Sequence, residues 1–207
     1  MKAFEDHLAL GESQKAKEVL EHGKTDIGLS VYWFNMGRLH AEEASWADAR
    51  IAFLKSWQIQ PRSETRSNLE IVESKLLVSE VESPATIKDY LIHSTFFTGT
   101  QLALTLNLIL LVLGLLAYKR SRNIKKFAFT LFLMLLLSGL SIWTRHWPWS
   151  VAEQEIPVFI GPSEIFDKVT VIPKGIKILG TEKDSWIKII YPSRFEGWIK
   201  KENISEL

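Results

Sequence analysis

The chain of 207 residues contains no cysteine. This excludes disulfide bridges and any metal site with cysteine ligands. The formal net charge of +1 gives no overall preference for nucleic acid or for an acidic partner. The sequence also lacks a phosphate-binding P-loop, a G-x-S-x-G nucleophile motif, an H-E-x-x-H zinc motif and a glycine-rich dinucleotide turn. We therefore expect a non-enzymatic protein, with no catalytic residue, no metal and no cofactor.

Charged residues are also missing from two long stretches in the middle of the chain. No Asp, Glu, Lys or Arg occurs from Tyr90 to Tyr118 or from Phe127 to Thr144. A membrane-spanning helix needs about 20 mostly apolar residues. A helix in the core of a globular protein normally keeps a polar stripe, which neither stretch has. The sequence therefore predicts a two-helix transmembrane hairpin, with spans over residues 99–118 and 127–144.

The link between the two stretches, residues 119–126, is strongly basic. Basic residues that flank a span are retained in the cytoplasm during insertion. The link is therefore predicted to be a cytoplasmic loop, oriented by Lys119, Arg120, Arg122, Lys125 and Lys126. Both ends of the chain would then lie in the periplasm, outside a bacterial inner membrane. Because the N-terminal part has no signal peptide that would export it, we also expect the given start to lie inside a longer gene.

The N-terminal part, residues 1–82, has apolar residues at helical spacing. The stretch YWFNMGRLHAEEASWADARIAFLKSWQIQP, residues 32–61, holds two such blocks, split by AEEAS. It resembles the tetratricopeptide repeat, in which small and large residues alternate between two antiparallel helices. The matching structural positions are Trp33, Met36, Gly37, Trp46, Ala49, Phe53 and Pro61. The resemblance implies a concave, peptide-binding face that carries Val31, Phe34, Arg38 and Glu42.

The C-terminal part, residues 155–207, changes from helical to strand periodicity. Short β-branched runs alternate there with turn residues, as in VTVIPKG, IKILGTEKD and SWIKIIYP. The order of these motifs resembles the bacterial SH3b family and implies a small all-β SH3-like barrel. Its candidate ligand-binding residues are Phe159, Trp186 and Trp198, although at least one of the two tryptophans could instead fill the core of the barrel.

The predicted fold class is thus multidomain. It comprises all-α repeat hairpins, an interfacial linker helix over residues 83–98, the transmembrane hairpin, a linker over residues 145–154 and the barrel. This module order resembles the BatE family of bacterial aerotolerance proteins. The resemblance implies a membrane-anchored scaffold on the periplasmic face, assembling with von Willebrand A proteins of the Bat family and a MoxR-type ATPase system in envelope stress or aerotolerance.

Two alternatives to the scaffold stay open from the sequence alone. The first is a membrane-anchored module that binds peptidoglycan through the barrel. The second is a redox or metal-binding membrane protein that uses His93 and His146, one at the outer end of each predicted span.

Overall fold

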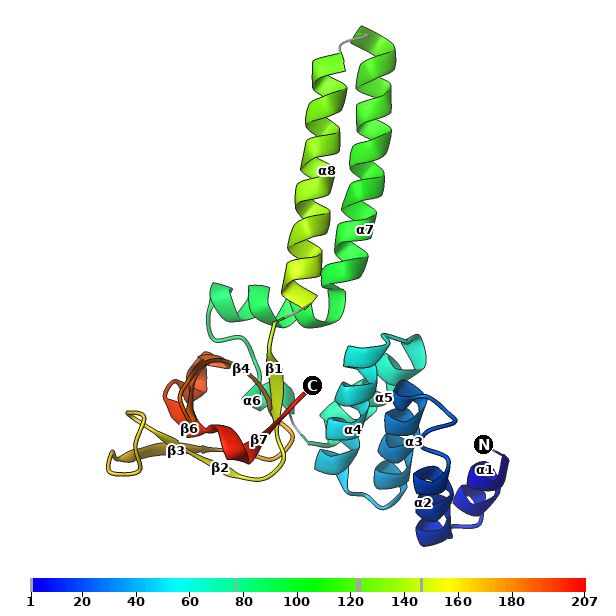
Figure 1. The fold of residues 1–207 in the computed structure, drawn as a ribbon, viewed down its shortest axis with the longest axis vertical. Helices are drawn as coiled ribbons and strands as arrows, with labels where there is room; N and C mark the ends of the chain where they lie inside the picture. Colours follow the sequence, from blue (N-terminus) through cyan, green and yellow to red (C-terminus); the bar gives the residue numbers. More distant parts are fainter. Residues whose placement is uncertain (1, 77, 122–123, 146) are drawn as a thin grey trace. The chain divides into compact units, whose positions relative to one another are not determined.

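A computed structural model of the chain describes residues 2–76, 78–121, 124–145 and 147–207. The chain divides into two compact units. The first unit combines Met1–Ser83 with Trp149–Leu207, and the second is Pro84–Pro148. The first unit is therefore built from two stretches of sequence that the second unit separates, and it holds both the helical part and the strands (Figure 1).

The described residues of the N-terminal stretch of the first unit form six helices. They are α1 (Lys2–Ala9), α2 (Ser13–His22), α3 (Leu29–Glu42), α4 (Trp46–Ile59), α5 (Ser63–Lys75) and α6 (Val78–Val81). Gly11 has a φ of +71° in the turn between α1 and α2, a conformation that glycine adopts without strain. One apolar core joins α1 to α4, and its buried members are Phe4, Ala16, Leu20, Tyr32, Met36, Leu39 and Ala52.

Helices α3 and α4 run antiparallel and approach each other closely (Figure 1). A Cβ atom on Gly37 would lie 2.6 Å from the ring of Phe53, so only glycine fits at this crossing. Nearer the start of α3, the Ser56 hydroxyl donates to the Ser30 carbonyl oxygen at 2.9 Å. Small residues on one helix therefore make room for a large side chain on the other.

The C-terminal stretch forms a seven-stranded antiparallel sheet. The strands are β1 (Trp149–Ala152), β2 (Ile156–Phe159), β3 (Lys168–Ile172), β4 (Lys177–Lys183), β5 (Trp186–Tyr191), β6 (Trp198–Lys200) and β7 (Ile204–Glu206). Two short 3-10 helices, η1 (Ser193–Phe195) and η2 (Lys201–Asn203), connect the last strands. One face of the sheet carries the core, which also takes in Val78 of α6; the strand residues in it are Ala152, Ile156, Val158, Ile172, Ile178, Ile187, Ile189 and Ile199.

The prediction of a closed SH3-like barrel is wrong, because the sheet is open. Its strand order is β3-β2-β6-β5-β4-β1-β7, so β3 and β7 stand at opposite edges and each pairs with a single strand among those described. Residues 149–152, expected to be part of a linker, form β1 instead. This strand pairs with β4 on one side and with β7 on the other.

The second unit is a helical hairpin of α7 (Ile87–Ser121) and α8 (Ile124–Arg145). The Asn107 side chain donates to the Ser138 hydroxyl at 2.8 Å, and Tyr118 packs against Phe127 at a centroid distance of 5.7 Å. A Cβ atom on Gly114 would lie 2.9 Å from the Thr130 side chain, so the helices are also close at this point. Polar and small residues within both uncharged stretches thus face the partner helix.

The prediction of a transmembrane hairpin is contradicted. Within the part of the chain that the structure describes, no helix is both long enough and apolar enough to cross a membrane. The spans over residues 99–118 and 127–144, the integral membrane association and the inner-membrane localisation with periplasmic ends are therefore corrected. The prediction rested on two uncharged stretches of about 20 mostly apolar residues without a polar stripe, and polar residues such as Asn107 and Ser138 lower the apolar character of these stretches.

The basic residues of the link consequently have no spans to orient. Lys119 is exposed near the end of α7, and Lys125 is exposed near the start of α8. Arg120 and Lys126 belong to the same two helices, whereas Arg122 lies outside the described residues. The predicted cytoplasmic loop is thus an end of the helical hairpin of the second unit.

Candidate functional site

The predicted peptide-binding face of the helical part is only partly open. The Arg38 guanidinium donates to both carboxylate oxygens of Glu5, at 2.6 and 2.9 Å, and lies over the ring of Phe4. This pairing lowers the pKa of Glu5, because Arg38 both donates hydrogen bonds to the carboxylate and brings a positive charge close to it. Phe34 packs against Phe53 at a centroid distance of 5.8 Å. Val31 is half-buried and Glu42 is exposed, so the structure leaves no free cation at Arg38 for a peptide.

Most of the residues on which the repeat resemblance rests are buried or half-buried in the helical part. Trp33 is half-buried, and the Lys55 ammonium lies 4.7 Å from its ring centroid. Of the others, Met36, Gly37, Ala49 and Phe53 are buried, Trp46 is half-buried and Pro61 is exposed.

The three aromatic candidates of the C-terminal part lie together on the sheet. Phe159 of β2 pairs directly with Trp198 of β6, and Trp186 is on the neighbouring strand β5. The rings of Phe159 and Trp186 meet edge to face, with centroids 5.6 Å apart. All three side chains are half-buried. We call Phe159, Trp186 and Trp198 the aromatic shelf.

The aromatic shelf lies on the face of the sheet that points away from its core. Along β5, Trp186 and Lys188 alternate with Ile187 and Ile189, and both isoleucines are core residues. Trp198 is likewise followed by the buried Ile199. Because successive side chains of a strand point to opposite faces, the shelf faces outward. The shelf tryptophans therefore do not fill the core. The sequence grouped these residues as ligand candidates, but it did not show on which face of the sheet they lie.

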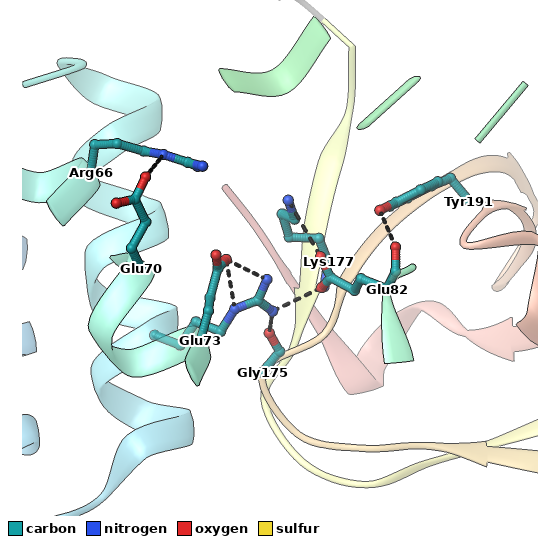
Figure 2. Close-up of polar contacts among 8 residues, drawn as sticks. Arg66, Glu70, Glu73, Glu82, Gly175, Lys177 and Tyr191 are labelled. Atoms are coloured by element: carbon teal, nitrogen blue, oxygen red, sulfur yellow. Dashed lines mark hydrogen bonds and ion pairs between the residues drawn. The ribbon is translucent and has the colours of Figure 1, made fainter. Parts of the chain in front are cut away.

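A second cluster, which the sequence analysis missed, is buried between the helical part and the sheet (Figure 2). Its centre is Arg50 of α4, whose side chain has no exposed surface. The guanidinium donates to Glu73 of α5 at 2.9 Å, to Glu82 at 2.8 Å and to the Gly175 carbonyl oxygen. Lys177 of β4 completes the group, with its ammonium 3.4 Å from the other Glu82 oxygen. We call Arg50, Glu73, Glu82 and Lys177 the buried ion cluster.

The charges of the buried ion cluster balance, and this determines how each group titrates. Burial raises the pKa of Glu82, but the positive charges of Arg50 and Lys177 outweigh it and bring this pKa down to about 2. Burial also lowers the pKa of Lys177, while Glu82 opposes that shift. Two cations face two carboxylates, so removing any one member leaves a buried charge without compensation.

Further hydrogen bonds and ion pairs hold the helical part and α6 to the C-terminal stretch. The Tyr191 hydroxyl donates to the Glu82 carbonyl oxygen at 3.3 Å, and the Arg194 guanidinium donates to the Val81 carbonyl oxygen at 3.2 Å. Nearer the surface, two ion pairs link α4 to the C-terminal stretch, Lys174 with Asp48 at 2.6 Å and Lys55 with Glu153 at 3.1 Å. The helices and the sheet of the first unit are thus joined through polar contacts as well as through the apolar contact of Val78.

In the sequence, the only indication of this buried cluster is that two charged residues lie inside apolar runs. Arg50 follows Ala49 and precedes IAFL in a buried helix, and Lys177 stands in the run IKIL of a buried strand. Charged side chains at such positions are rarely buried unless they are paired. The sequence shows that partners are needed, but it does not show which carboxylates supply them.

In the part of the chain that the structure describes, no group of three or more histidine, cysteine or acidic side chains could hold a metal ion. His93 is half-buried in α7, and His146 lies outside the described residues, so the proposed histidine pair has no described geometry.

Comparisons with protein-family models, with curated proteins and with solved structures found no match to this chain. The resemblances to tetratricopeptide repeats and to SH3b domains therefore rest on the motif residues alone, and the resemblance to the BatE family rests on a module order whose transmembrane hairpin is contradicted.

Proposed function

We propose that the chain is a non-enzymatic protein-interaction scaffold that docks a partner protein on the aromatic shelf. The observation that carries this proposal is the placement of Phe159, Trp186 and Trp198 side by side on the face opposite the core. Partly exposed aromatic side chains provide large contact areas with little loss of side-chain freedom, and they are enriched where proteins bind one another.

The buried ion cluster supports the proposal by holding the sheet to the helices. A docking surface on a firmly held element pays less ordering entropy on binding than one on a mobile element.

Site-specific photo-crosslinking in the native host tests the scaffold function. A benzoylphenylalanine is placed at Phe159 or at Trp198 of the full chain, and the matched control carries it at Phe166, which is 49% exposed in the loop between β2 and β3 and lies outside the shelf. A discrete protein adduct is expected at the two shelf positions, and Trp186→Ala should abolish it.

Two results would contradict the scaffold function. One is the absence of any adduct at either shelf position, and the other is the same adduct pattern at Phe166. The wall-binding alternative is separated by sedimentation of the full chain with purified sacculi. Enrichment in the pellet that depends on Trp186, without a protein adduct, would favour wall binding over a protein partner.

A further inference from the structure

Lysines and tryptophans form a checkerboard on the outward face of the sheet. Trp186 of β5 pairs with Lys200 of β6, and Lys188 of β5 pairs with Trp198 of β6. Directly paired residues of antiparallel strands have Cβ atoms about 5 Å apart and point to the same face. Each tryptophan of the shelf therefore has a lysine beside it on the next strand and another lysine two residues along its own strand.

The checkerboard extends at both ends. Lys183 of β4 pairs with Trp186 on the side away from Lys200, so this indole lies between two lysines. Phe159 of β2 pairs with Trp198 on the side away from Lys188. Aromatic and cationic residues thus alternate along and between β5 and β6, while β2 adds the ring of Phe159 on one side and β4 adds the cation of Lys183 on the other.

One lysine of the checkerboard already holds carboxylates of its own chain. The Lys200 ammonium lies 2.6 Å from Glu164 and 3.4 Å from Glu202. Lys183 and Lys188 are exposed, and within the described residues neither has an acidic partner at ion-pair distance. Two cations of the face are therefore open to an external acid.

We propose that the aromatic shelf binds an extended acidic peptide in which an aromatic or aliphatic residue stands two positions from an Asp or Glu. This inference rests on the proposed function and names the ligand that the shelf takes. Alternate side chains of an extended peptide are about 6.8 Å apart on one side. The same spacing separates Trp186 from Lys188 along β5, so one apolar side chain covers an indole while the acid two residues later meets a lysine.

Charge complementarity favours an acidic peptide over a nucleic acid. Three lysines share this face, but two glutamates already neutralise Lys200. A nucleic acid-binding surface needs a longer row of free cations, because its affinity comes mainly from contacts with many phosphates. Two free lysines beside aromatic rings match a short segment with one or two carboxylates.

Titration of the full chain with defined peptides tests the ligand class. The probe is a ten-residue glycine–serine peptide that carries phenylalanine and glutamate two positions apart, and a second peptide has glutamine in place of the glutamate. Binding is followed through the indole N–H signals of the eight tryptophans, with those of Trp186 and Trp198 assigned by Trp→Phe variants. Saturable shifts of these two signals are expected with the acidic peptide, and at least a threefold weaker affinity with the glutamine peptide.

Surface lysine variants give the matched comparison without disturbing the core. Lys188→Gln should weaken the acidic peptide about threefold, and Lys183→Gln with Lys188→Gln about tenfold. Lys17→Gln, an exposed lysine on α2, should leave binding unchanged. Trp186→Ala should abolish the shifts at Trp198, and its far-ultraviolet spectrum and unfolding midpoint show whether the sheet is retained.

Three outcomes would overturn the proposed ligand class: equal affinity for the acidic and the glutamine peptide, tighter binding of oligothymidylate than of the acidic peptide, and no peptide binding at all. If shelf crosslinks to a protein are found but the charge preference is missing, the scaffold function stands and the acidic ligand does not. If the acidic peptide binds as expected but no protein crosslinks, the ligand chemistry stands and the scaffold function does not.

Discussion

The Glu82 carboxylate accepts a hydrogen bond from the backbone N–H of Lys177 at 2.9 Å, across 95 residues of chain. The same carboxylate oxygen accepts from the Arg50 guanidinium at 2.8 Å. One side chain at the end of α6 therefore satisfies a helix residue and a strand residue together. Because Glu82 is only 3% exposed, water cannot replace these bonds when the carboxylate is removed.

Glu82→Gln is expected to destabilise the first unit strongly. The substitution keeps the size of the side chain but leaves Arg50 and Lys177 as two buried cations with only Glu73 to balance them. Breaking a buried ion pair on one side lowers the free energy of unfolding by about 3–5 kcal/mol. Urea unfolding, followed by far-ultraviolet circular dichroism, measures this loss.

Glu70→Gln is the matched control for that substitution. Glu70 lies one turn before Glu73 on α5 and pairs with Arg66 at 2.9 Å, but its side chain is 60% exposed (Figure 2). Exposed pairs of this kind contribute about 0–1 kcal/mol. Equal effects of the two substitutions would show that the buried ion cluster does not join the helices to the sheet.

The stability of the first unit should depend on the ionisation of Glu82 at acid pH. In the unfolded chain this carboxyl has an ordinary pKa of 4.5, and in the folded chain the pKa is about 2. Above about pH 4.5 the group is ionised in both states and its stabilisation is complete. Between pH 4.5 and pH 2 the unfolded chain takes up the proton first, so the stabilisation is lost progressively, by roughly 3 kcal/mol in total.

Unfolding curves of the wild type and of Glu82→Gln between pH 6 and pH 2 test this dependence. The wild type should lose more stability than the variant over the window, and the difference between the two proteins should shrink as the pH falls. Parallel curves would exclude a depressed pKa of Glu82.

Tyr191→Phe is expected to cause a small and specific loss. The hydroxyl donates to the Glu82 carbonyl oxygen at 3.3 Å, and the ring packs edge to face against Trp149 at 5.8 Å. Removing the hydroxyl leaves the ring contact in place and should lower the free energy of unfolding by about 1 kcal/mol. Tyr90→Phe, at an exposed tyrosine of α7, should have no effect in the same urea experiment.

Gly37→Ala tests the close approach of α3 and α4. Alanine favours a helix over glycine, but its Cβ atom would lie 2.6 Å from the Phe53 ring. Overpacking of this kind lowers the free energy of unfolding by about 1–3 kcal/mol. Gly139→Ala on α8 meets nothing within 4 Å and should be neutral or stabilising. The pair is compared by thermal unfolding, and a stabilising Gly37→Ala would show that the two helices do not touch there.

Local features of the first unit could be read from the sequence. The stretch AEEAS separates α3 from α4, because the apolar periodicity stops there. A glycine that faces a phenylalanine is typical of two helices that pack closely, as α3 and α4 do. The β-branched runs after residue 155 correspond to strands, because alternation and turn residues are local signals.

The strand order and the structure of the second unit were harder to predict from the sequence, because both depend on contacts between residues that are far apart in the chain. The run of Trp149–Ala152 is short and was assigned to a linker, yet it forms a strand that pairs with both β4 and β7. The two uncharged stretches were interpreted as membrane spans, and no described helix satisfies that interpretation. Low charge alone does not separate an apolar helix that pairs with a second helix from one that spans a bilayer.

The candidate sites also depend on contacts that local sequence signals do not reveal. Phe159, Trp186 and Trp198 were predicted as a group, since motif spacing places them on strands, but only the register puts them beside Lys183 and Lys188. The buried ion cluster could not be assembled from the sequence, because its members come from α4, α5, the end of α6 and β4.

Tyr191 touches the chain at both places where the second unit interrupts the first. Its hydroxyl binds Glu82, just before the chain leaves at Ser83, and its ring contacts Trp149, just after the chain returns. The exit and the entry are therefore close enough for a linker of roughly five residues, at about 3.4 Å each, to connect them. The hairpin of α7 and α8 is in this sense a cassette, and a shortened gene that replaces residues 84–148 with such a linker should still encode the helices, the sheet and the shelf.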